Sequence, residues 1–144
     1  MEITLLDRSN YYRGLLILIG KDRQVSDEEK AMFKSLGKEL GFNKEFCEGA
    51  VNELLENEYI IEEPPKFSNI EIAKLFIRDG IKLAFADKEL HLYELSWLKS
   101  VADTNSIDNT WGLEQFEQFK NHKNGSNEFE IIKLFNSGIL KEIT

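Results

Sequence analysis

The sequence predicts an all-α fold of about seven helices. In almost every segment the apolar residues recur with the helical period of 3.6, and no segment shows a convincing two-residue period of a β-strand. Residues that favour helix starts and stops fall between these segments. A third observation is an internal repeat, because residues 14–42 and 79–107 match at an offset of 65. We therefore expect two pseudo-repeated helical hairpins packed as one bundle.

The first half of the bundle, about residues 10–57, should hold three helices. The first runs over about 10–21, with its apolar residues on one face. Ser26 and Glu29 form a capping box that opens the second helix, and Gly41 is a natural stop for it. Asn43 can cap a third helix, whose apolar positions keep the helical spacing.

A connector over about 58–68 separates the halves, since Pro64 and Pro65 force an extended or turn conformation. Ser68 and Glu71 form a second capping box, which opens a helix over about 69–86. This helix is apolar on most sides, so it should be the most buried one. A fifth helix over about 92–104 completes the second half, residues 68–107.

The remaining residues, 109–144, are expected to add two C-terminal helices. One runs over about 109–122, and the other over about 128–137, ending at Gly138. The apolar residues of the last helix should dock onto its own domain, although a partner could receive them instead. We expect residues 1–144 to form a single domain.

Charge and composition exclude several classes of function. The chain has 26 acidic and 18 basic residues and a net charge of −8, without a basic stripe that could neutralise phosphates. Nucleic acid is therefore not expected as a partner. The single cysteine, Cys47, allows no internal disulfide and favours a reducing compartment. The first residues do not resemble a secretory signal, and no apolar run could span a bilayer, so we expect a cytoplasmic protein.

The repeat contains the same acidic pattern twice. Residues 20–29 (GKDRQVSDEE) and 85–94 (FADKELHLYE) align so that Asp22 falls on Asp87 and Glu29 on Glu94. Each pattern lies between two helices, in a link that holds one aliphatic residue. A helical hairpin of this kind cannot bury its apolar face alone, so the two copies should pack together.

This double pattern resembles the TerB-like domains of tellurite-resistance proteins, whose hairpin reads Ala-Asp-Gly-x-aliphatic-x-x-x-Glu. Residues 86–94 (ADKELHLYE) match it except that Lys88 replaces glycine; in residues 21–29 (KDRQVSDEE), Lys21 replaces alanine and Arg23 replaces glycine. The resemblance covers about residues 10–107. It implies an all-helical domain, a charged-partner or metal site, and a role in stress or tellurite resistance. It also implies a protein partner, with attachment to a peripheral membrane complex as one setting.

Two interpretations of the repeated acids follow. Asp22, Glu29, Asp87 and Glu94 could together hold a hard divalent cation such as Ca²⁺ or Mg²⁺. Alternatively, each glutamate caps its own helix and each aspartate accepts hydrogen bonds from the same helix start. Arg23 and Lys88 place a cation beside each aspartate, which favours the second interpretation.

No motif for catalysis was found. His91 and His122 lack metal-ligand spacing, and the sequence holds no phosphate-binding glycine loop or nucleophile elbow. We therefore predict a non-enzymatic cytoplasmic module that presents an acidic surface to a protein partner and receives an apolar element of it in a groove between the hairpins, without a required cofactor. A divalent-cation sensor is the alternative, and an enzyme working through a carboxylate pair is a third, weaker class.

Overall fold

In a computed structural model, the structure describes residues 1–20, 27–56, 63–85, 91–121 and 128–143. These ranges hold seven helices and two short strands, so the predicted all-α class is confirmed. The elements in chain order are β1 (Glu2–Thr4), α1 (Leu5–Gly20), α2 (Asp27–Glu39), α3 (Lys44–Glu56), α4 (Ile70–Ala84), α5 (Leu92–Thr104), α6 (Asn109–Asn121), α7 (Glu130–Asn136) and β2 (Lys141–Ile143). No helix within these ranges is long and apolar enough to cross a membrane.

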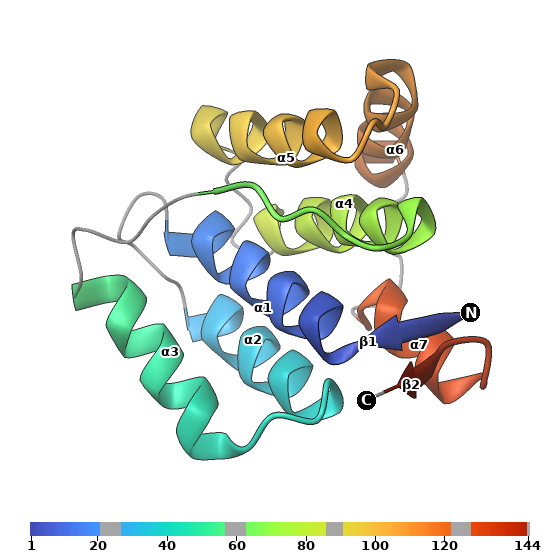
Figure 1. Ribbon diagram of the computed structural model, residues 1–144. Coiled ribbons are helices and arrows are strands. Elements are labelled where there is room, and N and C mark those ends of the chain that lie inside the picture. The colour runs from blue at the N-terminus through green and yellow to red at the C-terminus, as the bar shows by residue number, and fades with distance from the viewer. Residues whose placement is uncertain (21–26, 57–62, 86–90, 122–127, 144) are drawn as a thin grey trace.

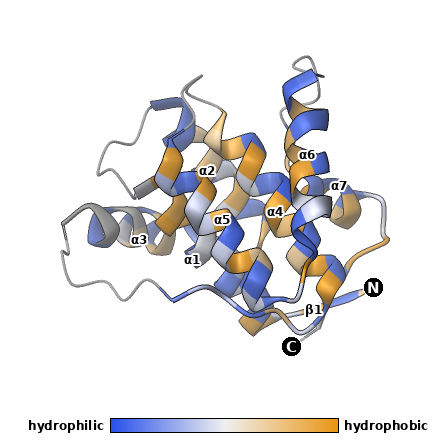
Figure 2. Cartoon of the chain, turned by 90° about the horizontal axis from the view of Figure 1, so that it is seen from above, coloured by the Kyte–Doolittle hydropathy of each residue, from blue (hydrophilic) through white to orange (hydrophobic). Residues whose placement is uncertain are grey.

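The two helices α1 and α4 lie side by side in the middle of the molecule (Figure 1). The helices α2 and α3 pack on α1 and on each other, and α5 and α6 do the same with α4. One apolar cluster runs through both halves, with Tyr11, Phe33 and Phe76 among its fully buried members. Figure 2 shows hydrophobic positions gathered where the central helices meet. This burial of one face of each helix is the main source of stability that the fold offers.

The repeat extends over three helices in each half, further than the sequence suggested. The helix pair α2 and α5 begins at Asp27 and Leu92 and ends at Glu39 and Thr104, each 65 positions apart. The same offset relates both ends of α3 to those of α6, and the start of α1 to that of α4; α4 ends one residue short of it. We call α1–α3 the first copy and α4–α6 the second copy. The helix α6 thus belongs to the repeat and not to a C-terminal extension.

Helix starts also correspond between the copies. Thr4 Oγ1 accepts a hydrogen bond from the N–H of Asp7 before α1, and Asn69 Oδ1 accepts one from Glu71 before α4. Asn43 and Asp108 cap α3 and α6 in the same way, so the predicted Asn43 cap is confirmed. The predicted Ser68 cap is wrong by one residue, since Asn69 is the cap.

Ser68 instead donates its hydroxyl hydrogen to the carboxylate of Asp7, which also accepts from the Ser68 N–H. The sequence could not show this long-range partner, which lies on α1. Ser26, the predicted cap of α2, lies outside the described residues.

The helices α2 and α5 end in the same turn. Gly41 has a φ of 91° and its counterpart Ser106 a φ of 58°, both in the left-handed region. After each, the next residue's N–H donates to the carbonyl five positions back, from Phe42 to Gly37 and from Ile107 to Ala102. This pairing is the Schellman motif, which satisfies carbonyl groups that a helix end leaves free. The predicted stop at Gly41 is thereby confirmed.

Two features lie outside the repeat. The strands β1 and β2 pair in parallel, with Ile3 opposite Glu142, and so join the ends of the described chain. Three residues each are too few for a recognisable two-residue period, so the sequence did not reveal them. The helix α7 packs on α4 and buries Phe129 and Ile132, as expected for a helix that docks onto its own domain.

Candidate functional site: an open groove in the second copy

The structure places two of the four predicted cation ligands. Glu29 and Glu94 are both buried and both occupy the third position of their helices, α2 and α5. Asp22 and Asp87 lie outside the described residues. Within the described ranges, no cluster of three or more histidine, cysteine or acidic side chains could hold a metal ion. The Ca²⁺ or Mg²⁺ site stays a prediction.

Glu94 caps the start of its own helix, α5. Its Oε1 accepts a hydrogen bond of 3.2 Å from the backbone N–H of His91, the residue before α5. A glutamate at this position satisfies a free N–H and meets the positive end of the helix dipole. This contact supports the capping interpretation of the repeated acids.

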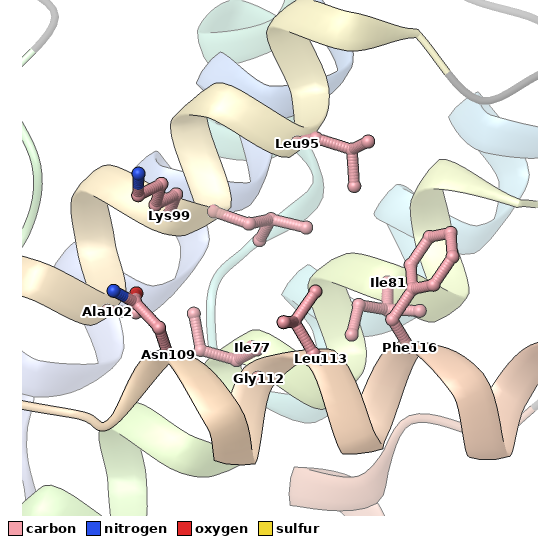
Figure 3. A pocket seen from close by; sticks show the side chains of 10 residues that line it. Ile77, Ile81, Leu95, Lys99, Ala102, Asn109, Gly112, Leu113 and Phe116 are labelled. Atoms are coloured by element: carbon pink, nitrogen blue, oxygen red, sulfur yellow. The ribbon is translucent and has the colours of Figure 1, made fainter.

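A groove in the second copy has a mostly apolar lining. It lies between α4, α5 and α6, has a volume of about 390 Å³, and opens to solvent. Its floor includes Ile77 and Ile81 of α4 (Figure 3). The ten lining residues are Ile77, Ile81, Leu95, Leu98, Lys99, Ala102, Asn109, Gly112, Leu113 and Phe116. The volume falls within the range of known ligand pockets, which are mostly apolar with a few polar groups.

The mouth of the groove exposes apolar side chains to solvent. Leu113 of α6 is 68% exposed, and Leu92 of α5 is 81% exposed. Leu92 lies one helical turn before Leu95, so the apolar stripe of α5 continues beyond the groove. In Figure 3, α5 and α6 are close near Ala102 and Asn109 and diverge towards Leu95 and Phe116. The groove therefore widens away from the turn that joins the two helices.

The first copy fills the corresponding space with its own side chains. Tyr12, the counterpart of Ile77, is 2% exposed and packs its ring 4.3 Å from that of Phe33. Cys47, the counterpart of Gly112, is buried beside Gly37. The second copy has shorter side chains at both positions, Ile77 and Gly112. A β-carbon built on Gly112 would meet no atom within 4 Å, so this side of the groove is open.

The surfaces above the two spaces also differ. In the first copy the counterparts of Leu95, Asn109 and Leu113 are charged: Lys30, Lys44 and Glu48. Lys44 and Glu48 form an ion pair of 3.9 Å across one helical turn. The second copy replaces these three charges with two leucines and an asparagine. One copy is thus closed beneath a charged surface, whereas the other is open beneath an apolar one.

A buried polar cluster surrounds Asp79 of α4, whose side chain is fully buried. Its carboxylate accepts hydrogen bonds from the Tyr11 hydroxyl and from the N–H groups of Glu130 and Ile131. Burial raises the pKa of Asp79 from 3.8 to about 6, against the lowering effect of these donors and of Lys82. Burial, followed by the nearby Asp79 charge, raises the pKa of Tyr11 well above 10. All donors come from the protein itself, so the cluster fastens α7 to the two copies.

Sequence reasoning expected a groove between the two hairpins, whereas this groove lies within the second copy, and it missed the Asp79 cluster. The sequence did contain a signal for the groove. When the two copies are aligned at the offset of 65, apolar or neutral residues of the second copy align with charged residues of the first. A signal for Asp79 was an acid within the most apolar run, at a position where the first copy has Gly14. Cys47 and Trp97 are buried in the core. Trp111 is half-buried beneath the cations of Lys74 and Arg78.

The fold and groove define the class: an all-α protein built from a duplicated three-helix unit, with one copy closed and one open. No family model, curated protein or solved structure matches this chain.

Proposed function

We propose that this chain is a non-enzymatic protein-interaction module in which the groove of the second copy receives an apolar side chain of a partner protein. One observation carries the proposal. The groove is open and apolar, whereas the same space in the first copy is filled by Tyr12 and Cys47 beneath charged residues. Filling an apolar groove with a side chain removes both surfaces from water, which favours association.

The chemistry of the groove supports binding over catalysis. Of the ten lining side chains, Lys99 is the only one that titrates. A carboxylate pair or a histidine base would need acidic or imidazole groups there. The buried Asp79 is enclosed by hydrogen-bond donors of its own chain. A groove of this kind supplies shape and apolar surface, which are the terms of recognition.

The TerB-like assignment belongs to the same proposal. It is supported by the double Asp–x₆–Glu pattern and by two helical hairpins that share their caps at an offset of 65. With it we propose a cytoplasmic location and a role in a stress or tellurite-resistance response. A fold supports many functions, so these last two statements depend on the family resemblance alone.

A peptide-display selection tests the interaction. A random peptide library would be selected on the wild-type protein and on Gly112→Leu, which adds a side chain at a residue that lines the groove and whose β-carbon would meet no atom within 4 Å. Gly49→Leu is the matched control, because Gly49 lies on α3, the counterpart helix, and also has open space around it. We expect the wild type and Gly49→Leu to enrich the same peptides, each with a bulky apolar residue, and Gly112→Leu to lose them.

Circular dichroism would first show that both variants keep their helices. If the selected peptides bind Gly112→Leu as well as the wild type, the groove is not the binding site. If the wild type enriches no peptide, the proposed function is wrong for peptide partners.

A further inference from the structure

We infer that the segment entering the groove is an amphipathic helix with two apolar anchors one turn apart and a carboxylate that pairs with Lys99. This inference rests on the proposed function and adds the shape and charge of the partner. Two observations support it: the form of the groove, and the difference in charged residues between the second copy and the equivalent positions of the first.

The form of the groove indicates a helix. Its floor residues Ile77 and Ile81 are one helical turn apart on α4, and the 390 Å³ volume has room for more than one side chain. The two walls, α5 and α6, diverge towards Leu95 and Phe116 (Figure 3), and the cavity between them and α4 opens to solvent, as a rod-shaped element requires. A helix that enters such a groove presents anchors at i and i+3 or i+4.

The apolar surface is also longer than a small molecule would need. Leu92 extends the stripe of α5 by one turn beyond Leu95, and Leu113 borders the mouth on α6; Leu92 and Leu113 are both strongly exposed. Exposed apolar residues that adjoin a pocket mark interaction surfaces more often than isolated ones do. A protein helix can cover this whole stripe at once.

The charge of the partner follows from comparing the copies. The first copy has four charged residues at the positions considered: Lys30, Lys34, Lys44 and Glu48. The second copy has lost three of them and keeps only Lys99, the counterpart of Lys34. Lys99 is exposed at the groove and forms no ion pair within the described part of the chain. A lone ammonium group beside apolar side chains is suited to a carboxylate of the bound segment.

The neighbouring acids restrict where that carboxylate can lie. Asp103 follows Lys99 by one turn on α5, and Glu117 follows Leu113 by one turn on α6; both are exposed. A partner acid placed beyond Lys99 would meet these like charges, which oppose binding. The groove therefore favours one carboxylate next to the anchors and not a generally acidic segment.

The test uses synthetic helical peptides and a charge exchange. Three otherwise identical peptides carry leucine at position i and phenylalanine at i+4 as anchors. They differ at one position between the anchors, on the side of the helix that faces Lys99, which is glutamate, glutamine or lysine. Each is titrated against the wild type, Lys99→Glu and Lys34→Glu by isothermal calorimetry. Lys34→Glu is the matched control, because it makes the same change at the equivalent exposed position of the first copy.

For the wild type and Lys34→Glu, we expect the glutamate peptide to bind at least threefold more tightly than the glutamine peptide. Exposed ion pairs give differences of this size. Lys99→Glu should reverse the order, so that the lysine peptide binds best. Moving the phenylalanine from i+4 to i+2 should weaken binding at least tenfold, since the two anchors then leave the same face.

The outcomes separate this inference from the proposed function. If peptides from the selection bind the groove but the order of charges does not change in Lys99→Glu, the inference is wrong and the proposed function stands. If the i+2 peptide binds as well as the i+4 peptide, the partner is not a helix. If both the selection and these peptides fail on the wild type, the proposed function fails with the inference.

Discussion

Tyr11 donates a hydrogen bond of 2.5 Å to Asp79 Oδ2, and this bond joins the first helix of one copy to the first helix of the other. The same carboxylate accepts from the N–H groups of Glu130, at 2.6 Å, and Ile131, at 3.2 Å. One fully buried side chain thus connects α1, α4 and α7. Burying this carboxylate removes it from water, which costs free energy when the group is charged. The stability of the protein should therefore depend on pH.

The first prediction concerns the pH range from about 4 to 6. Burial raises the pKa of Asp79 from 3.8 to about 6, so the folded state binds a proton more readily than the unfolded state. The stabilising contribution is full below pH 4 and is lost as the pH rises through 6. A shift of this size corresponds to about 3 kcal/mol in the free energy of unfolding. Urea unfolding at pH 4.5, 5.5, 6.5 and 7.5 would measure it.

Asp79→Asn should remove this component, because the amide does not titrate, while Asp103→Asn, on the surface, should keep it. Burial raises the pKa of Glu130, but Lys82 and Lys133 together outweigh that effect and lower it. The contribution of Glu130 is therefore lost only as the pH falls below about 4.5, the lowest pH at which unfolding is measured. Equal pH profiles of wild type and Asp79→Asn would contradict the prediction.

The second prediction concerns the turn after α5. Ser106 has a φ of 58°, a conformation that costs an L-residue with a side chain about 1 kcal/mol, whereas its counterpart Gly41 adopts it freely. Ser106→Gly should therefore raise the free energy of unfolding by roughly 0.5–1 kcal/mol, and Gly41→Ser should lower it by a similar amount. Midpoints of denaturant unfolding give both values. A loss of stability in Ser106→Gly would show that the serine side chain has a role in the turn.

The third prediction concerns close packing between α1 and α4. A β-carbon on Gly14 would lie 2.7 Å from Cε2 of Phe76, which is fully buried and packed against the ring of Tyr11. Gly14→Ala should cost about 2 kcal/mol, as overpacked cores do. Gly49→Ala, with open space on α3, should instead gain about 1 kcal/mol from helix propensity. If thermal unfolding shows equal shifts for the two variants, the contact with Phe76 is not tight.

The fourth prediction tests the repeated acids. Because Glu94 accepts a hydrogen bond from the N–H of His91, Glu94→Ala should cost about 1 kcal/mol, since alanine leaves that N–H without its acceptor. Millimolar Ca²⁺ or Mg²⁺ should leave the unfolding temperature unchanged. A cation bound at 100 times its dissociation constant would add about 2.7 kcal/mol. Such a gain in the wild type, absent from Asp22→Asn/Asp87→Asn, would identify a cation site and refute the capping interpretation.

The sequence was sufficient to predict the helices and most of their ends, because these depend on local signals. Apolar periodicity, the Asn43 cap and the Gly41 stop all act within a few residues. The partners of Ser68 and Asp79 could not be predicted, since they lie on helices remote in the chain. The groove was expected between the hairpins, and its true position within the second copy was not predicted, for a related reason. It is defined by the side chains that the second copy lacks, and only comparison with the filled first copy makes that visible.

The filled interior of the first copy has a consequence for the effects of amino-acid substitutions. Tyr12, Phe33 and Cys47 fill the interior of the first copy, where the second copy has Ile77, Leu98 and Gly112 beside an open groove. If the proposed function holds, the first copy contributes mainly to stability and the second mainly to binding. Substitutions in the first interior should mainly alter unfolding, and those at the groove mainly alter partner choice. If the first copy supplies enough stability, the protein should tolerate substitutions in the second copy. The duplicated architecture thus offers a place where new specificity can evolve at little risk to the fold.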